Sequence, residues 1–303
     1  MSPRELHPVV RRLRTVFWLR GLLSRLRMNT VVELGQFIER EACERTGTSR
    51  ARKWRDYERA GRSPRTWLVN LADASSSRGI PGDGQVVSGA GSRAEFDHVL
   101  WEVLGMFDAD AVRVRQWIDR LSPKVRALML SALKRRSERG RSVAPIPTHR
   151  ELNRLELLAG LDALAAVTII VKQAHLVRRH GVAHEAGQSL CKMLWMMTPM
   201  FADRGICEQL FDAYQRLVLP LTACRSYKEG GFRLSIERRG LLARAGWLHA
   251  QAHPSAGGAW PALPNREWAL RVRSTMIEHR FADYYHEQFL DRDDIDKVYS
   301  AGA

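Results

Sequence analysis

The chain has 303 residues, of which 48 are Lys or Arg and 33 are Asp or Glu, so its formal net charge is +15 at pH 7. Apolar residues make up 45% of the sequence, a globular value that excludes a wholly disordered chain. The positive charge is uneven, because residues 1–150 carry 29 basic and 16 acidic side chains whereas residues 151–303 carry 19 and 17. This asymmetry predicts a polyanionic partner for the N-terminal half.

Cysteine spacing and hydropathy restrict the class of protein further. The four cysteines are widely spaced and form no CxxC pair: Cys43, Cys191, Cys207 and Cys224. Such spacing excludes a zinc ribbon and favours reduced thiols in a cytoplasmic protein. The most apolar run, residues 155–171, contains Glu156 and Asp162, so it predicts a buried helix and not a membrane span. Arginines interrupt the apolar N-terminal stretch, which argues against a signal peptide.

The first predicted helix covers residues 9–28, where no acidic residue occurs. Its apolar positions share one helical face: Val10, Leu13, Phe17, Leu22 and Leu26. Its cations are spread over the rest: Arg12, Arg14, Arg20, Arg25 and Arg27. This pattern fits a helix that binds an anionic surface or a partner helix, and it equally fits an ordinary surface helix that packs on the protein body.

The most specific motif lies in residues 46–72, which read TGTSRARKWRDYERAGRSPRTWLVNLA. A small polar cap, Thr48 or Ser49, opens a short basic helix that ends near Glu58, and a glycine turn and Pro64 lead into an apolar helix. This order resembles the second half of a lambda-repressor-like helix-turn-helix domain over about 25 residues. The matching positions are Gly47-Thr48-Ser49, Tyr57-Glu58, Gly61, Pro64, Leu68, Val69 and Leu71.

The resemblance implies a recognition-like helix over residues 49–56 and DNA as the partner. Its arginines would contact phosphates or guanine edges, because one guanidinium can bond guanine O6 and N7 together. The expected nucleic-acid-binding residues are Ser49, Arg50, Arg52, Lys53, Arg55, Arg59 and Arg62. Trp54 and Tyr57, three residues apart, are expected to pack inward as core. The alternative for the cations is an ordinary solvated face.

Three parts are expected along the chain: a basic helical module with the helix-turn-helix-like unit over residues 1–73, a Gly/Ser-rich linker over 74–94, and a helical body over 95–303 with a candidate sub-boundary near 140–148. The class is mostly α. In the body, Ser122-Pro123 predicts a helix start, and Thr148 with Glu151 predicts a capping box. Residues 231–236 are a weak strand candidate, and a last helix is expected over residues 266–289.

A second basic segment follows the predicted helix start at Pro123. Its cations are Lys124, Arg126, Lys134, Arg135, Arg136, Arg139 and Arg141. Most of them lie at the end of that predicted helix, where they also favour the helix dipole. The segment either extends a nucleic-acid-binding surface or only stabilises its own helix.

Catalytic patterns are scarce, since no GxSxG or P-loop motif occurs, and we expect neither a cofactor nor a metal. Residues 179–184 read RHGVAH and resemble the Arg-polar-x3-His signature of HEPN-type ribonucleases, which are metal-independent. That resemblance implies that Arg179, beside His180, steadies a phosphate while His184 moves the proton of a 2′-hydroxyl. The same Arg-to-His spacing recurs elsewhere in this Arg-rich chain, so the spacing has little specificity.

These observations predict a mostly α protein that binds nucleic acid, DNA in preference to RNA, as a regulator or defence-associated factor. They favour a binding protein over an enzyme. The alternatives are a HEPN-like ribonuclease and a scaffold subunit of a nucleoprotein complex. The body is expected to form a homodimer or bind a protein partner, while its Met-rich stretch is expected to be core: Met193, Trp195, Met196, Met197 and Met200.

Overall fold

The computed structural model describes residues 6–40, 51–59, 61–78, 91–106, 110–137, 147–225, 230–237, 239–252, 266–278, 285–291, 293–294 and 297. The described chain is mostly helical, as predicted. It divides into two compact units. Unit 1 is Met1–Trp101 with Phe201–Cys207, and unit 2 is Glu102–Met200 with Glu208–Ala303.

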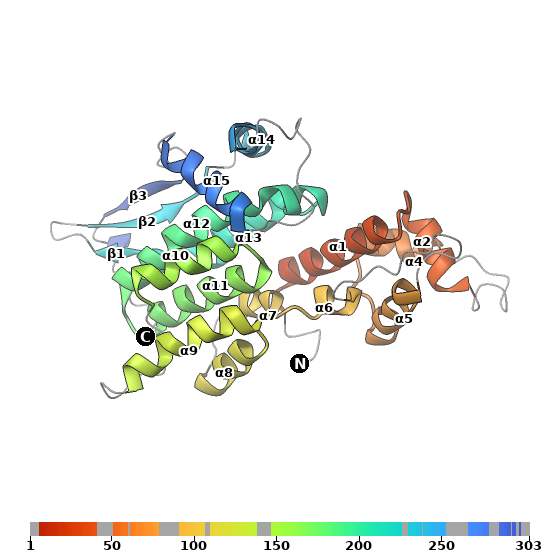
Figure 1. Cartoon of the computed structure of the whole chain (residues 1–303), viewed down its shortest axis with the longest axis horizontal. Helices are drawn as coiled ribbons and strands as arrows, with labels where there is room; N and C mark the ends of the chain where they lie inside the picture. Colours follow the sequence, from red (N-terminus) through yellow and green to blue (C-terminus); the bar gives the residue numbers. More distant parts are fainter. Residues whose placement is uncertain are drawn as a thin grey trace. The chain divides into compact units, whose positions relative to one another are not determined.

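Unit 1 is built from short helices around one long one (Figure 1). The helices are α1 (Pro8–Arg25), α2 (Val31–Ile38), α4 (Ala51–Glu58), α5 (Thr66–Arg78) and α6 (Ser92–Phe96). The boundary with unit 2 falls inside α7 (Val99–Gly105).

Helix α1 forms as the periodicity predicts. It begins at Pro8, whose missing N–H is tolerated in a first turn, and the His7 side chain accepts from the Val9 amide. The five predicted apolar positions are all buried. One predicted surface cation is also buried: Arg14 is 8% exposed, and its guanidinium lies 4.1 Å from the centre of the Phe96 ring. The prediction that all the cations of this helix lie on its exposed side is therefore wrong for Arg14, which makes a cation–π contact in the core.

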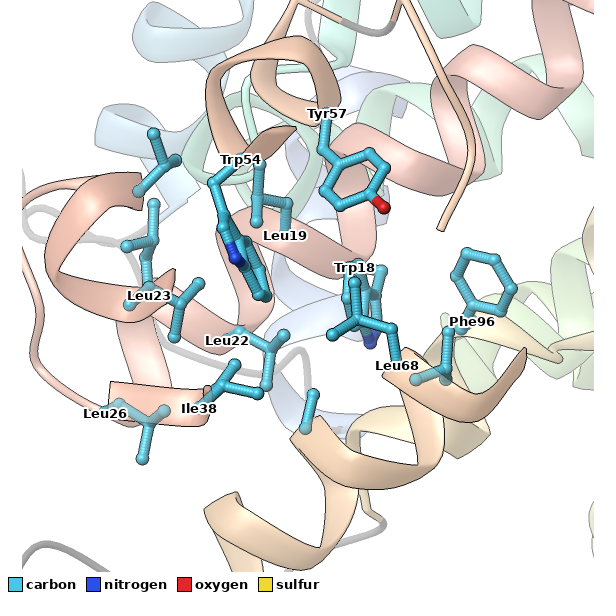
Figure 2. Packing of buried hydrophobic residues seen from close by; sticks show 14 residues of the cluster. Trp18, Leu19, Leu22, Leu23, Leu26, Ile38, Trp54, Tyr57, Leu68 and Phe96 are labelled. Atoms are coloured by element: carbon cyan, nitrogen blue, oxygen red, sulfur yellow. The ribbon is translucent and has the colours of Figure 1, made fainter. Parts of the chain in front are cut away.

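Aromatic rings make the centre of the unit 1 core (Figure 2). Trp18 of α1 stacks on Trp54 of α4 with ring centroids 6.4 Å apart, and it meets the edge of Phe96 at 5.5 Å. Trp54 and Tyr57 are 0% and 6% exposed, so the predicted inward packing of these two residues is confirmed. Gly35 of α2 lies directly against the Trp54 ring, where a Cβ atom would collide with it. The α2–α4 contact therefore needs a glycine at this position.

The predicted linker at residues 74–94 begins inside α5 and ends inside α6. Both helices belong to unit 1, and Phe96 of α6 contributes to its core. The Asp73 carboxylate of α5 accepts from the Ser92 hydroxyl at 3.2 Å and from the Arg93 amide at 2.9 Å, which ties the start of α6 to α5. The division of the chain in the structure thus falls at Trp101, and both ends of the Gly/Ser-rich segment lie within one unit.

Unit 2 contains most of the described helices and a small sheet. Its helical elements are α8 (Ala111–Asp119), α9 (Pro123–Ser137), α10 (His149–Leu158), α11 (Leu161–Leu176), α12 (His180–Asp203), α13 (Cys207–Leu217), η1 (Leu219–Thr222), α14 (Leu241–Ala252) and α15 (Arg266–Glu278). The end of α12 and the first residue of α13 fall within the Phe201–Cys207 segment of unit 1. Helix α11 packs against η1 and against α9 and α10, which flank it in Figure 1. The predicted starts at Pro123 and at the Thr148–Glu151 capping box are confirmed.

The core of unit 2 lies along α11 and α12. The apolar run 155–171 is divided between α10 and α11, which are separated at Ala159 by a left-handed backbone (φ 31°). The Met-rich stretch of α12 is core as predicted from Met193 to Met197, because Met193, Trp195 and Met197 are each 0% exposed, whereas Met200 is only partly buried. Within the described residues no helix is both long and apolar enough to cross a membrane.

Three antiparallel strands make the sheet, in the order β1 (Cys224–Arg225), β2 (Gly231–Ser235) and β3 (His286–Leu290). The weak strand predicted at residues 231–236 is confirmed as β2. The last helix predicted over residues 266–289 is wrong in its second half, since α15 ends at Glu278 and residues 286–290 form β3. Phe232 of β2 pairs with Phe289 of β3, and this cross-strand contact favours the extended form.

Candidate nucleic-acid interface

Helix α4 has two faces of opposite character. Trp54 and Tyr57 point into the core (Figure 2). Arg52, Arg55 and Arg59 lie three or four positions apart on the opposite face, and all three are exposed. Arg59 follows the last residue of the helix, but its amide still donates to the Arg55 carbonyl at 3.0 Å, so it continues the same face. We call these three residues the α4 arginine face.

A buried carboxylate fixes the orientation of α4. Glu39, which follows α2 and is 2% exposed, accepts from the Trp54 indole N–H at 2.6 Å. It also pairs with the Lys53 ammonium at 2.8 Å. Burying a carboxylate is costly unless charge and hydrogen bonds compensate it, and Lys53 and Trp54 provide both. Lys53, predicted to contact nucleic acid, is therefore held by the protein itself, and its ammonium also lies 5.2 Å from the centre of the Trp67 ring.

Unlike Lys53, the α4 arginine face is not paired with a described carboxylate of the protein. Within the part of the chain that the structure describes, Arg52, Arg55 and Arg59 form no ion pair. An exposed guanidinium without a carboxylate partner keeps all five N–H donors for water or for a ligand. The α4 arginine face is thus the most available group of donors among the predicted residues.

The turn after α4 adds further positive charge. Arg62 is 73% exposed and reaches the Asp56 carboxylate only at 3.8 Å, a long ion pair. Arg62 and Arg65 lie close enough to Tyr57 that their charges act to lower its pKa, although burial and the Glu39 charge raise it overall. The other two predicted residues, Ser49 and Arg50, lie outside the described residues.

The basic excess of the N-terminal half is shared between the two units. Residues 1–101 carry 18 basic and 11 acidic side chains, and residues 102–150, in unit 2, carry 11 and 5. Some of the arginines of unit 1 are also neutralised, because Arg25 and Arg204 both reach Glu95, at 2.5 and 3.4 Å. Charge counts over the sequence therefore do not by themselves locate an anion-binding surface.

The second predicted basic segment, after Pro123, belongs to unit 2. Lys124 is exposed, and Arg126 donates to the Asp119 carbonyl at 3.4 Å. The side chains of Lys134, Arg135 and Arg136, and residues Arg139 and Arg141, lie outside what the structure describes.

The alternative catalytic residues lie at the start of α12. Arg179 is exposed and directly precedes the helix, while His180 and His184 are one turn apart on it. The His180 ring meets the His175 ring edge-on at 5.7 Å. Burial lowers the pKa of His180, and the charges of His175, Arg178 and Arg225 lower it further.

His184 has the opposite electrostatic environment. Its Nδ1 lies 3.1 Å from the Thr222 carbonyl oxygen and its Nε2 lies 3.0 Å from Glu287 Oε1. Burial lowers the pKa of His184, but hydrogen bonding and attraction from Cys224, with the bonds to Glu287 and Thr222, outweigh it and raise the pKa to about 9. An imidazolium that donates from both nitrogens cannot take the proton of a 2′-hydroxyl. Ribonuclease activity at Arg179, His180 and His184 stays a prediction.

Among the described residues no three His, Cys, Asp or Glu side chains are grouped so that they could hold a metal ion. Two features of this region were not predicted from the sequence. One is Glu39, which orients α4, and the other is the contact between Thr15 and Ser63, whose hydroxyl oxygens lie 3.3 Å apart. The sequence carries no signal for either feature, because the partners lie 15 and 48 residues apart.

No protein-family model matches the chain, and neither a curated protein nor a solved structure matches it. Function is therefore inferred from the geometry of the chain itself.

Proposed function

We propose that this chain binds nucleic acid, DNA in preference to RNA, through the α4 arginine face. The observation that carries the proposal is that Arg52, Arg55 and Arg59 point away from the core and, among the described residues, pair with no carboxylate. Cations placed in this way are free to neutralise backbone phosphates, which supply most of the affinity of a DNA-binding protein.

The dimensions and the support of α4 favour a DNA groove. Eight helical residues span about 12 Å, and the major groove of B-DNA is about 12 Å wide and admits an α-helix. The helix is held rigidly, because Trp54 is fixed both by stacking on Trp18 and by the bond to Glu39. A rigid helix of exposed arginines backed by a second helix is the arrangement that the helix-turn-helix resemblance implies. The preference for DNA rests on that resemblance.

The proposal is tested by measuring affinity for duplex DNA, single-stranded DNA and RNA at one fixed ionic strength. The test variant is Arg52→Gln/Arg55→Gln/Arg59→Gln, which keeps the inward face of α4. Loss of three phosphate contacts is expected to weaken duplex binding at least about 100-fold near 0.1 M salt.

The matched control replaces three exposed arginines of unit 2 that make no ion pair with any described residue: Arg150→Gln/Arg154→Gln/Arg239→Gln. It removes the same charge and should leave affinity within about threefold of the parent. Equal weakening by both triple variants would mean that net charge, and not α4, governs binding. Tighter binding to RNA than to duplex DNA would contradict the stated preference.

A further inference from the structure

A small cavity lies beside α4, between the first turns of α1 and the turn that follows α4. Its volume is about 280 Å³. The residues that line it are Pro8, Arg11, Arg12, Thr15, Gly61, Arg62 and Ser63. All of them belong to unit 1.

Among the described residues that line the cavity, the charged ones are all arginines and none is a carboxylate. Arg11 and Arg12 form no ion pair with any described residue, and Arg62 reaches its carboxylate only at 3.8 Å. Three guanidinium groups brought together by segments about 50 residues apart in the chain repel one another when nothing lies between them. An anion in the cavity would remove this repulsion and accept hydrogen bonds from the arginine forks.

Two hydroxyl groups complete the wall. Thr15, which is 1% exposed, donates to the Arg11 carbonyl at 2.9 Å, and its oxygen lies 3.3 Å from the Ser63 hydroxyl. Because the Thr15 proton is used by Arg11, Ser63 is the donor in that shared contact. The Ser63 hydroxyl is neutral, and it can rotate so that its proton is donated to an anion in the cavity. The cavity thus offers guanidinium and hydroxyl donors, the set that binds phosphate oxygens in proteins.

We propose that this cavity binds a phosphate group of the DNA backbone, next to the surface that α4 presents to DNA. This inference rests on the proposed function. The volume lies just below the range of roughly 300–1,000 Å³ that is usual for small-molecule pockets, so it suits one phosphate with its attached sugar and not a larger ligand. Arg62 lies both in the turn after α4 and in the cavity wall, which joins the two surfaces.

The test uses inorganic phosphate as the probe and the full chain as the protein. Phosphate binding is followed by ³¹P line broadening, first alone and then with increasing duplex DNA. The parent is expected to bind phosphate, Arg11→Gln/Arg12→Gln to bind it about tenfold more weakly, and duplex DNA to displace it. The control Arg150→Gln/Arg154→Gln, which removes two exposed arginines from α10, should bind phosphate as the parent does.

Ser63→Ala removes one hydroxyl and no charge, so it tests the site independently of the double variant. It should weaken phosphate binding by about threefold. Absence of phosphate binding by the parent overturns the inference. Inorganic phosphate that stays bound when DNA binds also overturns the inference, because the cavity would then not be occupied by a phosphate of the DNA backbone. Either of these two outcomes, together with weaker DNA binding by Arg52→Gln/Arg55→Gln/Arg59→Gln, would refute the phosphate site and leave the proposed function standing. Phosphate binding by a parent that binds no DNA refutes both.

Discussion

Two groups of cations, one in each unit, differ in what their charges face. On α4, Arg52, Arg55 and Arg59 are exposed, and no described carboxylate pairs with them. In unit 2, Lys192 and Arg273 converge on Glu156, which is 0% exposed, at 3.3 and 3.2 Å. The first group is available to a ligand and the second neutralises the interior of the protein. A basic residue indicates a binding surface only when no buried acid uses its charge.

The largest stability effect is expected at Glu156. Replacing Glu156 by Ala leaves Lys192 and Arg273 without their carboxylate and removes the acceptor of the Ser189 hydroxyl at 2.7 Å. We expect a loss of about 3–5 kcal/mol in the free energy of unfolding, measured by urea denaturation. Glu185→Ala, which removes a 43% exposed carboxylate from α12, should cost less than about 1 kcal/mol. Equal losses would show that the Glu156 cluster is not structural.

In unit 1 the buried, paired carboxylate is Glu39, and its removal is also expected to lower stability. Glu39→Ala leaves the Trp54 indole without its acceptor and Lys53 without its ion pair, so we expect a loss of about 2–4 kcal/mol. Hydrogen exchange should report it as faster exchange in α2 and α4. Glu39→Gln keeps an acceptor for Trp54 and should lose less. Unchanged exchange rates in the alanine variant would refute the role of Glu39 in orienting α4.

His184 predicts a dependence of stability on pH. Its pKa in the folded protein is raised to about 9 from an ordinary 6.5, so the folded state holds the proton more tightly than the unfolded state does. The resulting stabilisation, at most about 3 kcal/mol, is fully present below pH 6.5 and is lost as the pH rises through 9. His184→Gln should flatten the stability profile between these values. A parent protein whose stability is constant across this window would contradict the assignment.

The smallest effect is expected for an ion pair on the surface of unit 1. Arg20 and Glu58 lie 3.3 Å apart, but their side chains are 42% and 37% exposed. Arg20→Gln should change the free energy of unfolding by less than about 0.5 kcal/mol, as measured by urea denaturation. A loss above 1 kcal/mol would show that exposed pairs in this protein contribute more than solvent screening allows.

Local features of this chain could be predicted from its sequence, because their partners lie within one or two helical turns. The capping box at Thr148 and the inward faces of α1 and α4 follow from spacing alone. Strand β3 could not be predicted, since four of its five residues are exposed and its partner strand lies about 55 residues earlier.

In the candidate site, too, contacts between residues distant in the sequence could not be predicted. Helical periodicity predicts the face of α4 that carries Arg52 and Arg55, whereas the ion pair of the adjacent Lys53 depends on Glu39, which follows α2. Likewise, the cavity exists only because α1 and the turn after α4 meet in space. The sequence therefore indicates which cations are present, and tertiary contacts decide which of them can bind a ligand.

The salt dependence of duplex DNA binding tests the central claim most directly. The slope of the logarithm of the association constant against the logarithm of salt concentration reports the number of phosphates that the protein contacts. Relative to the parent, Arg52→Gln/Arg55→Gln/Arg59→Gln should reduce this slope by about three, while Arg150→Gln/Arg154→Gln/Arg239→Gln should leave it unchanged. A slope that is the same in the parent and in the α4 variant would show that these arginines do not contact DNA.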